Sequence, residues 1–139
     1  MNIFDFFGSS SEYKTNFEHV QYAIKHNSEF CLINTLPRYE QSCLIKNTVH
    51  AAEEEEFINS MMNNVNVPDK KVIVYGKNAN DQSAEDKCKH LISIGLTDVC
   101  LYTGGMFEWM LLHDIYGDKE FPITEKVLDI LKFRPMKMI

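Results

Sequence analysis

The sequence lacks a long apolar run and a basic, apolar N-terminal segment. Its longest apolar runs, such as residues 72–75 and 109–112, are far too short to cross a bilayer, which takes about 20 residues. Residues 1–5 contain no basic stretch ahead of a long apolar run, so they do not resemble a secretory signal. We therefore expect no membrane partner and a location in the cytoplasm.

The sequence also lacks cysteines at a spacing that suits a metal site. The four cysteines, none of them spaced as metal ligands, are Cys31, Cys43, Cys88 and Cys100. The five histidines include no pair four residues apart, the spacing at which a helix presents two ligands. We expect no metal and no cofactor. Cys31, Cys88 and Cys100 are interpreted as small buried residues in a reducing compartment.

Basic residues are too few for a nucleic-acid-binding surface. The formal net charge is -6, whereas phosphate binding needs clustered lysine and arginine. The acidic excess is concentrated in the glutamates at residues 53–56. Acidic side chains suit the first turn of a helix, because they interact favourably with its dipole. The run is therefore interpreted as a solvated helix start, with a patch for a cation or a protein partner as the alternative.

The rest of the composition indicates one domain preceded by a short arm. The chain has 139 residues, 45% of them apolar, which suits a single globular domain. Residues 1–15 are expected to form an arm that docks on a surface, because it combines serines with aromatic side chains. Its phenylalanines are Phe4, Phe6 and Phe7. Residues 16–139 are expected to form the domain, with a helical extension from about residue 110.

Short apolar strands alternate with helices along this domain. Runs rich in β-forming residues predict strands at 30–33, 72–75 and 98–102, with a shorter extended piece at 44–49. Helical spacing predicts helices at 17–26, 53–64, 83–94, after Gly104-Gly105, and at 125–133. The strands are apolar on both sides, which predicts an α/β fold with three α/β/α layers around a central, mainly parallel sheet. Ligands of such folds bind beyond the carboxyl ends of strands, so we expect the site in the loop after Tyr75.

Residues that favour helix ends support three of these boundaries. Ser83 followed by Asp86 resembles a capping box at the start of the helix at 83–94. Gly95 suits the end of the same helix, where a left-handed residue is common. Thr124 is the expected cap of the last helix.

The segment 72–109 carries a resemblance to a known family. It reads VIVYGKNANDQSAEDKCKHLISIGLTDVCLYTGGMFEW. The segment contains five features in order. They are an apolar strand ending in Tyr, a loop, a helix opening with Ser-Ala, a Gly-Leu turn into a strand, and Gly-Gly before Trp. Upstream, segments 32–35 and 43–48 match further pieces. In order and spacing, residues 30–110 resemble a rhodanese-like domain, which implies a sulfurtransferase fold.

The tail of the chain has a narrower resemblance. Residues 109–132 are similar to rhodanese-like proteins encoded by large DNA viruses of protists. The asparagine-rich composition suits an AT-rich genome. This resemblance implies the host cytoplasm or the virion as the location.

The chain departs from the family at the positions that perform its chemistry. The resemblance implies a persulfide-carrying cysteine directly after Tyr75, and position 76 is glycine. Gln82 stands where the family has arginine, and Asp81 before it competes for the backbone N–H groups at the helix start. Asn34 and Leu36 replace the family's strand-end Asp and Arg. The degenerate active-site loop comprises Gly76, Lys77, Asn78, Ala79, Asn80, Asp81, Gln82 and Ser83.

Three hypotheses about function follow. The first is an inactive rhodanese-like module that binds an unknown protein partner through residues 53–56 or the aromatic arm. The second is residual enzymatic activity, such as sulfur transfer, through Cys43, which takes the place of a family histidine, or through an unrelated residue. The third is an anion or small-ligand sensor that uses the backbone N–H groups of residues 76–83. The arm and the tail either pack on the domain or form a homodimer contact.

Overall fold

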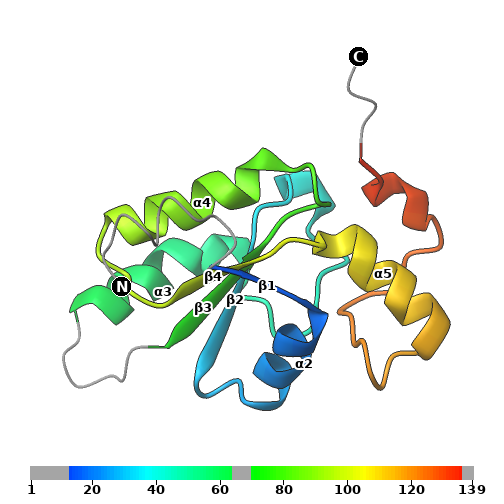
Figure 1. Ribbon diagram of the computed structural model, residues 1–139, viewed down its shortest axis with the longest axis horizontal. Helices are drawn as coiled ribbons and strands as arrows, with labels where there is room; N and C mark the ends of the chain where they lie inside the picture. Colours follow the sequence, from blue (N-terminus) through cyan, green and yellow to red (C-terminus); the bar gives the residue numbers. More distant parts are fainter. Residues whose placement is uncertain (1–12, 64–69, 136–139) are drawn as a thin grey trace.

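Strands and helices alternate along the described part of the chain, residues 13–63 and 70–135 of the computed structural model (Figure 1). The strands are β1 (Lys14–Thr15), β2 (Phe30–Asn34), β3 (Lys71–Tyr75) and β4 (Val99–Tyr102). The α-helices are α2 (Phe17–Lys25), α3 (Glu54–Asn63), α4 (Gln82–Ser93) and α5 (Gly105–Tyr116). Short 3-10 helices are η1 (Arg38–Glu40), η2 (Ala51–Glu53) and η3 (Ile130–Phe133). The phenylalanines and serines of the predicted arm lie outside the described residues.

The four strands form one parallel sheet in the order β1-β4-β3-β2. Asn34 is opposite Tyr75, and Tyr75 is opposite Tyr102, so the carboxyl ends of three strands lie level. Parallel strands require crossover connections, and helices provide most of them here. The predicted parallel sheet is confirmed.

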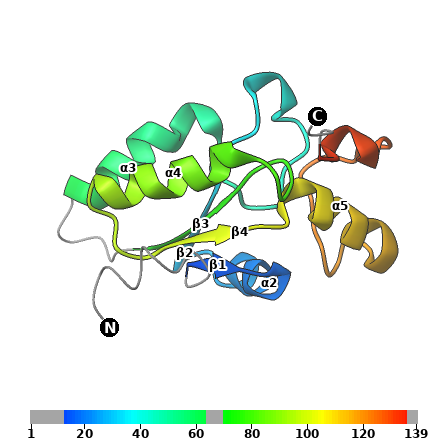
Figure 2. The same cartoon turned by 45° about the horizontal axis from the view of Figure 1, so that its top comes forward.

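Each face of the sheet is covered by a pair of helices, because alternate residues of the strands point to opposite sides. Leu32, Ile73 and Tyr75 pack in one core cluster with residues of α2 and α5. Cys31 and Val74 pack in the other, with residues of α3 and α4. Figure 2 shows α3 and α4 on one side of the sheet and α2 on the other. The α/β/α layering expected from the apolar strands is confirmed.

The end of α4 has the geometry expected for its glycine. Gly95 has a φ of +117°, in the region that favours glycine. Its N–H donates to the Ile92 carbonyl at 3.1 Å, and the Leu96 N–H donates to the Leu91 carbonyl at 3.1 Å. This pair of hydrogen bonds is the Schellman arrangement that ends many helices.

Two expectations near the ends of the described chain differ from the structure. Lys14 and Thr15, assigned to the arm, form β1 and pair with β4. The prediction of a helix at 125–133 is wrong. Within this range, only Ile130–Phe133 is helical, and it forms a 3-10 helix. Instead of capping a helix, the Thr124 hydroxyl donates to the Ser42 carbonyl at 3.0 Å and accepts from the Leu44 N–H at 3.0 Å. The extended piece at 44–49 likewise makes only isolated bridges.

The side chain of Tyr75 joins the sheet to this irregular segment. It is fully buried, and its hydroxyl accepts a hydrogen bond from the Ile45 N–H at 3.2 Å. The Thr48 hydroxyl lies 2.7 Å away and donates its own proton to the Ile45 carbonyl. Burial raises the pKa of Tyr75 above its usual value, so the phenol stays protonated. One buried hydroxyl therefore holds residues 45–48 against β3.

We predict that Tyr75→Phe lowers the free energy of unfolding by about 1–3 kcal/mol, because it leaves a buried N–H of Ile45 without its acceptor. The matched control is Tyr39→Phe, since the Tyr39 side chain is 84% exposed and its hydroxyl reaches solvent. Urea denaturation of both variants measures the difference. Equal stabilities of the two variants would contradict the assigned role of the Tyr75 hydroxyl.

Candidate functional site

The candidate site lies at the carboxyl edge of the sheet, in the loop between β3 and α4. Loops that follow parallel strands meet at one edge of the sheet. The loop at 76–81 therefore lies near residues 35–41, which follow β2, and near the start of α5, which follows β4. This is the position that the sequence pattern predicted for a ligand site.

The backbone of the loop is bound to the N-terminus of α5. The carbonyl oxygens of Gly76 and Lys77 accept hydrogen bonds from the N–H groups of Met106 at 3.0 Å and Phe107 at 2.9 Å. Gly105 begins α5 with a φ of +65°, and a Cβ there would lie 2.7 Å from the Gly76 carbonyl oxygen. Only glycine lets the two backbones approach this closely. Two of the N–H groups at the start of α5 are thus used within the chain.

The carboxylate of Asp81 takes the N–H groups at both ends of the loop. Its Oδ2 accepts from the Lys77 N–H at 2.8 Å. Its Oδ1 accepts from the Ser83 N–H at 3.0 Å and from the Ser83 hydroxyl at 2.5 Å. Asp81, and not Ser83, is therefore the N-cap of α4, so the predicted capping box is wrong. The expected competition of Asp81 for these N–H groups is confirmed.

Gly76 is buried directly beside this carboxylate. A Cβ at position 76 would lie 2.7 Å from Asp81 Oδ2, 3.0 Å from Asp81 Cγ and 3.1 Å from the Ala84 Cβ. The φ of Gly76 is outside the left-handed region, so its backbone conformation suits any residue. Space, and not conformation, restricts this position.

The side chain of Asn78 helps to fix the shape of the loop. The Asn78 Oδ1 accepts from the Asn80 N–H at 2.9 Å, and the Asn78 Nδ2 donates to the Phe133 carbonyl at 3.0 Å. The second bond ties the loop to η3 near the end of the described chain. Ala79 and Asn80 are exposed. Gln82 reaches along α4, with its Nε2 3.4 Å from Glu85 and 3.3 Å from Asp86.

The lysine of the loop has a partner that lies far away in sequence. Lys77 Nζ is 3.2 Å from Glu40 Oε1, and both side chains are largely buried. Glu40 Oε2 is buried and has no hydrogen-bond partner among the described residues. The positive charge of Lys77 is thus balanced by a carboxylate of η1. Sequence analysis missed Glu40, because it precedes Lys77 by 37 residues and belongs to no motif.

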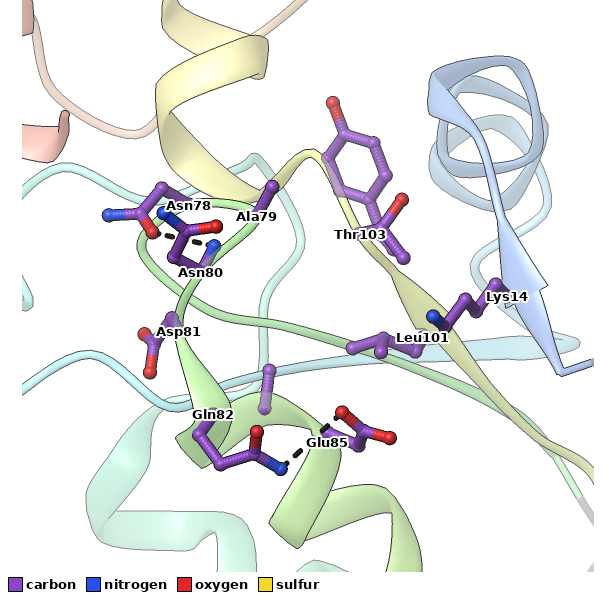
Figure 3. A pocket seen from close by; sticks show the side chains of 11 residues that line it. Lys14, Asn78, Ala79, Asn80, Asp81, Gln82, Glu85, Leu101 and Thr103 are labelled. Carbon is purple, nitrogen blue, oxygen red and sulfur yellow. Dashed lines mark hydrogen bonds between the residues drawn. The ribbon is translucent and has the colours of Figure 1, made fainter. Parts of the chain in front are cut away.

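Two open hollows flank the loop. Figure 3 shows the first, of about 340 Å³, between the loop, the start of α4 and the end of β4. Asp81 points away from Leu101 and Lys14 in this view, and it lines both hollows. The second hollow measures about 410 Å³. Its lining residues, from the loop and the segment after β2, are Thr35, Pro37, Lys77, Asn78, Asn80, Asp81 and Ser83.

The structure does not give Cys43 a partner in the loop. Its side chain is buried, and the Sγ lies 3.7 Å from the Sδ of Met110 in α5. Burial raises the pKa of the Cys43 thiol to about 11, so the thiol is protonated at neutral pH. A nucleophilic or metal-binding cysteine acts as the thiolate. The described residues also contain no cluster of side chains that could hold a metal ion.

The other positions that depart from the family pattern have packing roles. The Asn34 Oδ1 accepts from the Leu36 N–H at 3.0 Å and from the Gln41 Nε2 at 2.8 Å. Leu36 is buried in the core, where an arginine would lose its hydration. Trp109 is fully buried, as expected, and its Nε1 donates to the Pro122 carbonyl at 3.1 Å.

Among the described helices, none has the length and apolarity to cross a membrane.

Solved structures share this arrangement at low sequence identity. A full-length protein from Lactobacillus plantarum matches with a TM-score of 0.62 at 12% identity, covering 88% of this chain and 95% of that one. A protein from Bacillus halodurans matches with 0.58 at 15% identity, covering 78% and 79%. A protein from Anabaena sp. matches with 0.57 at 16% identity, covering 85% and 84%. Such identities show the fold alone.

A search among curated proteins finds no match. The family model described as "Rhodanese-like domain" matches residues 17–112, well over half of the chain. The matched region begins with α2 and extends into α5, so it includes the loop at 76–81 and most of both core clusters. The chain belongs to the rhodanese-like domain family.

Proposed function

We propose that this protein is a rhodanese-like domain without sulfurtransferase activity and that it binds another protein. The observation that carries the proposal is the glycine directly after β3. Sulfur transfer in the family is expected to pass through a cysteine persulfide at this position. Gly76 has no side chain, so it forms no bond to sulfur.

The other cysteines are poor substitutes for the missing nucleophile. Burial raises the pKa of Cys43 to about 11 and the pKa values of Cys31 and Cys88 to about 12. Burial also raises the pKa of Cys100. Each of these thiols is therefore protonated near neutral pH, and the protonated form is a weak nucleophile. Residual sulfurtransferase activity through Cys43 has correspondingly little support.

Anion sensing by the loop is also poorly supported. The Asp81 carboxylate already accepts hydrogen bonds from the N–H groups of Lys77 and Ser83. The Lys77 ammonium group pairs with Glu40. An external anion would compete with two carboxylates of the chain for these donors and for this charge.

A protein partner fits the acidic start of α3. Glu54 faces α4 and pairs with Lys87 at 2.6 Å, whereas Glu53, Glu55 and Glu56 are exposed. An open hollow of about 420 Å³ lies beside them. Carboxylates next to an apolar hollow suit a partner with basic and apolar side chains. A cytoplasmic or virion location and a homodimer contact of the arm or tail stay predictions.

We expect the purified wild-type protein to transfer no sulfur from thiosulfate to cyanide above the rate without protein, because residue 76 has no thiol. The assay runs beside an active rhodanese domain as a positive control. A robust rate would falsify the proposal. In that case, Cys43→Ser shows whether Cys43 supplies the thiol.

The acidic surface generates a second prediction. Reversing Glu53, Glu55 and Glu56 to lysine is expected to weaken partner binding about tenfold, because three exposed ion pairs contribute roughly 0.2–1 kcal/mol each. The partner is first isolated by affinity capture with the wild-type protein, and its Kd is then measured by calorimetry.

The matched control reverses three exposed acidic residues on and after α5, Asp114, Glu120 and Glu125. It changes the net charge equally and leaves α3 intact. Equal affinity of both triple variants contradicts a binding role of the α3 surface.

A further inference from the structure

We infer that the Asp81 carboxylate occupies the space beside Gly76 in the degenerate loop, so that a side chain at position 76 can be accommodated only if the carboxylate moves. The inference rests on the proposed function, in which the loop performs no catalysis, and it adds which group occupies the space of a residue-76 side chain. Nothing in the sequence pattern assigns this pairing of Gly76 with Asp81. A side chain at position 76 and the Asp81 carboxylate in its present position cannot be accommodated together.

The distances show that the two groups compete for one space. A Cβ on Gly76 would lie 2.7 Å from Asp81 Oδ2 and 3.0 Å from Asp81 Cγ. Carbon and oxygen atoms that are not bonded to each other do not approach this closely at equilibrium. A residue with a side chain at position 76 therefore requires the carboxylate to move.

The carboxylate is held where it is. Three donors converge on it, from the Lys77 N–H, the Ser83 N–H and the Ser83 hydroxyl. The Ser83 hydroxyl lies 2.8 Å from Thr35 Oγ1, which follows β2, so the contact reaches a second strand. Hydrogen bonds to a charged acceptor are stronger than those between neutral groups. Moving Asp81 would break the N-cap of α4 at the same time.

The loop cannot relieve the contact by moving its backbone. The Ala84 Cβ would stand 3.1 Å from the added atom on the side of α4. The Gly76 carbonyl is bound to the Met106 N–H, and Gly105 packs directly against it. The loop is thus confined between two helices, and the side chain of Asp81 is the part that must yield.

The consequence is that two positions, and not one, keep the site inactive. A thiol restored at position 76 alone would collide with Asp81, and its thiolate would lie beside a negative charge. In its present position, the Asp81 carboxylate is therefore expected to be compatible only with glycine at position 76.

A double-mutant cycle between the two positions tests the inference. Gly76→Ala adds only the Cβ, and its backbone conformation is allowed, so any loss reports the contact. We expect Gly76→Ala to lower the Tm by about 5 °C in the wild-type background, as overpacking does. In the Asp81→Ala background, the same substitution is expected to lower it by less than about 1 °C. An equal loss in both backgrounds overturns the inference.

Matched variants separate space from charge. Asp81→Asn keeps the volume and removes the charge, so Gly76→Ala should still lower the Tm by about 5 °C. Asp86→Ala removes one charge from an exposed position of α4, and it should leave the loss unchanged as well. If Asp81→Asn or Asp86→Ala reduces the decrease in Tm that Gly76→Ala causes, a steric contact with Asp81 is not its cause. Asp81→Ser is a second shortened variant that retains a helix cap, should Asp81→Ala fold poorly.

A chemical measurement gives an independent result. In Gly76→Cys, we expect native-state alkylation of the introduced thiol by iodoacetamide to accelerate about tenfold when Asp81→Ala is added, because the N–H groups at the helix start then stabilise the thiolate. Peptide mass spectrometry identifies the modified position. Equal alkylation rates with and without Asp81 contradict the inference. Sulfur transfer by the wild-type protein would refute the proposed function instead, and it would leave the cycle unaffected.

Discussion

The structure depends on the contact between the loop at 76–81 and the N-terminus of α5. Through it, the loop after β3 and the helix after β4 are held together at the carboxyl edge of the sheet. Gly105 makes the approach possible, since any Cβ there would meet the backbone of the loop. The helix that follows carries Met106, Trp109 and Met110 into the larger core cluster. One close backbone contact thus places a site-forming loop and a core-forming helix together.

Most of the fold could be predicted because its signals are local. Each main strand is a short run of β-forming residues buried on both faces, so its apolar pattern identified it. β1 was not predicted, because Lys14 and Thr15 have no apolar pattern and form a strand only by pairing with β4. The helix expected at 125–133 was wrong because Thr124 binds residues 42–44, and such a tertiary contact leaves no mark in local spacing.

The candidate site was predictable to the same extent and for the same reason. The position of the loop followed from the sheet topology, and the competition of Asp81 for N–H groups followed from its place at a helix start. Pairing of Lys77 with Glu40 could not be predicted, since it joins two crossovers through space. The short distance between Gly76 and Asp81 depends on how tightly the loop turns, and the amino-acid composition of the loop does not determine this.

The edges of the sheet also limit how another molecule can attach. On one side, β1 offers a strand of only two residues. On the other, the middle of β2 is bridged, because Thr48 pairs with Leu32 and the Val49 N–H donates to the Leu32 carbonyl at 2.8 Å. A short edge strand and a bridged edge strand both hinder the addition of a further strand. Edge-to-edge assembly of this domain into extended sheets is accordingly disfavoured.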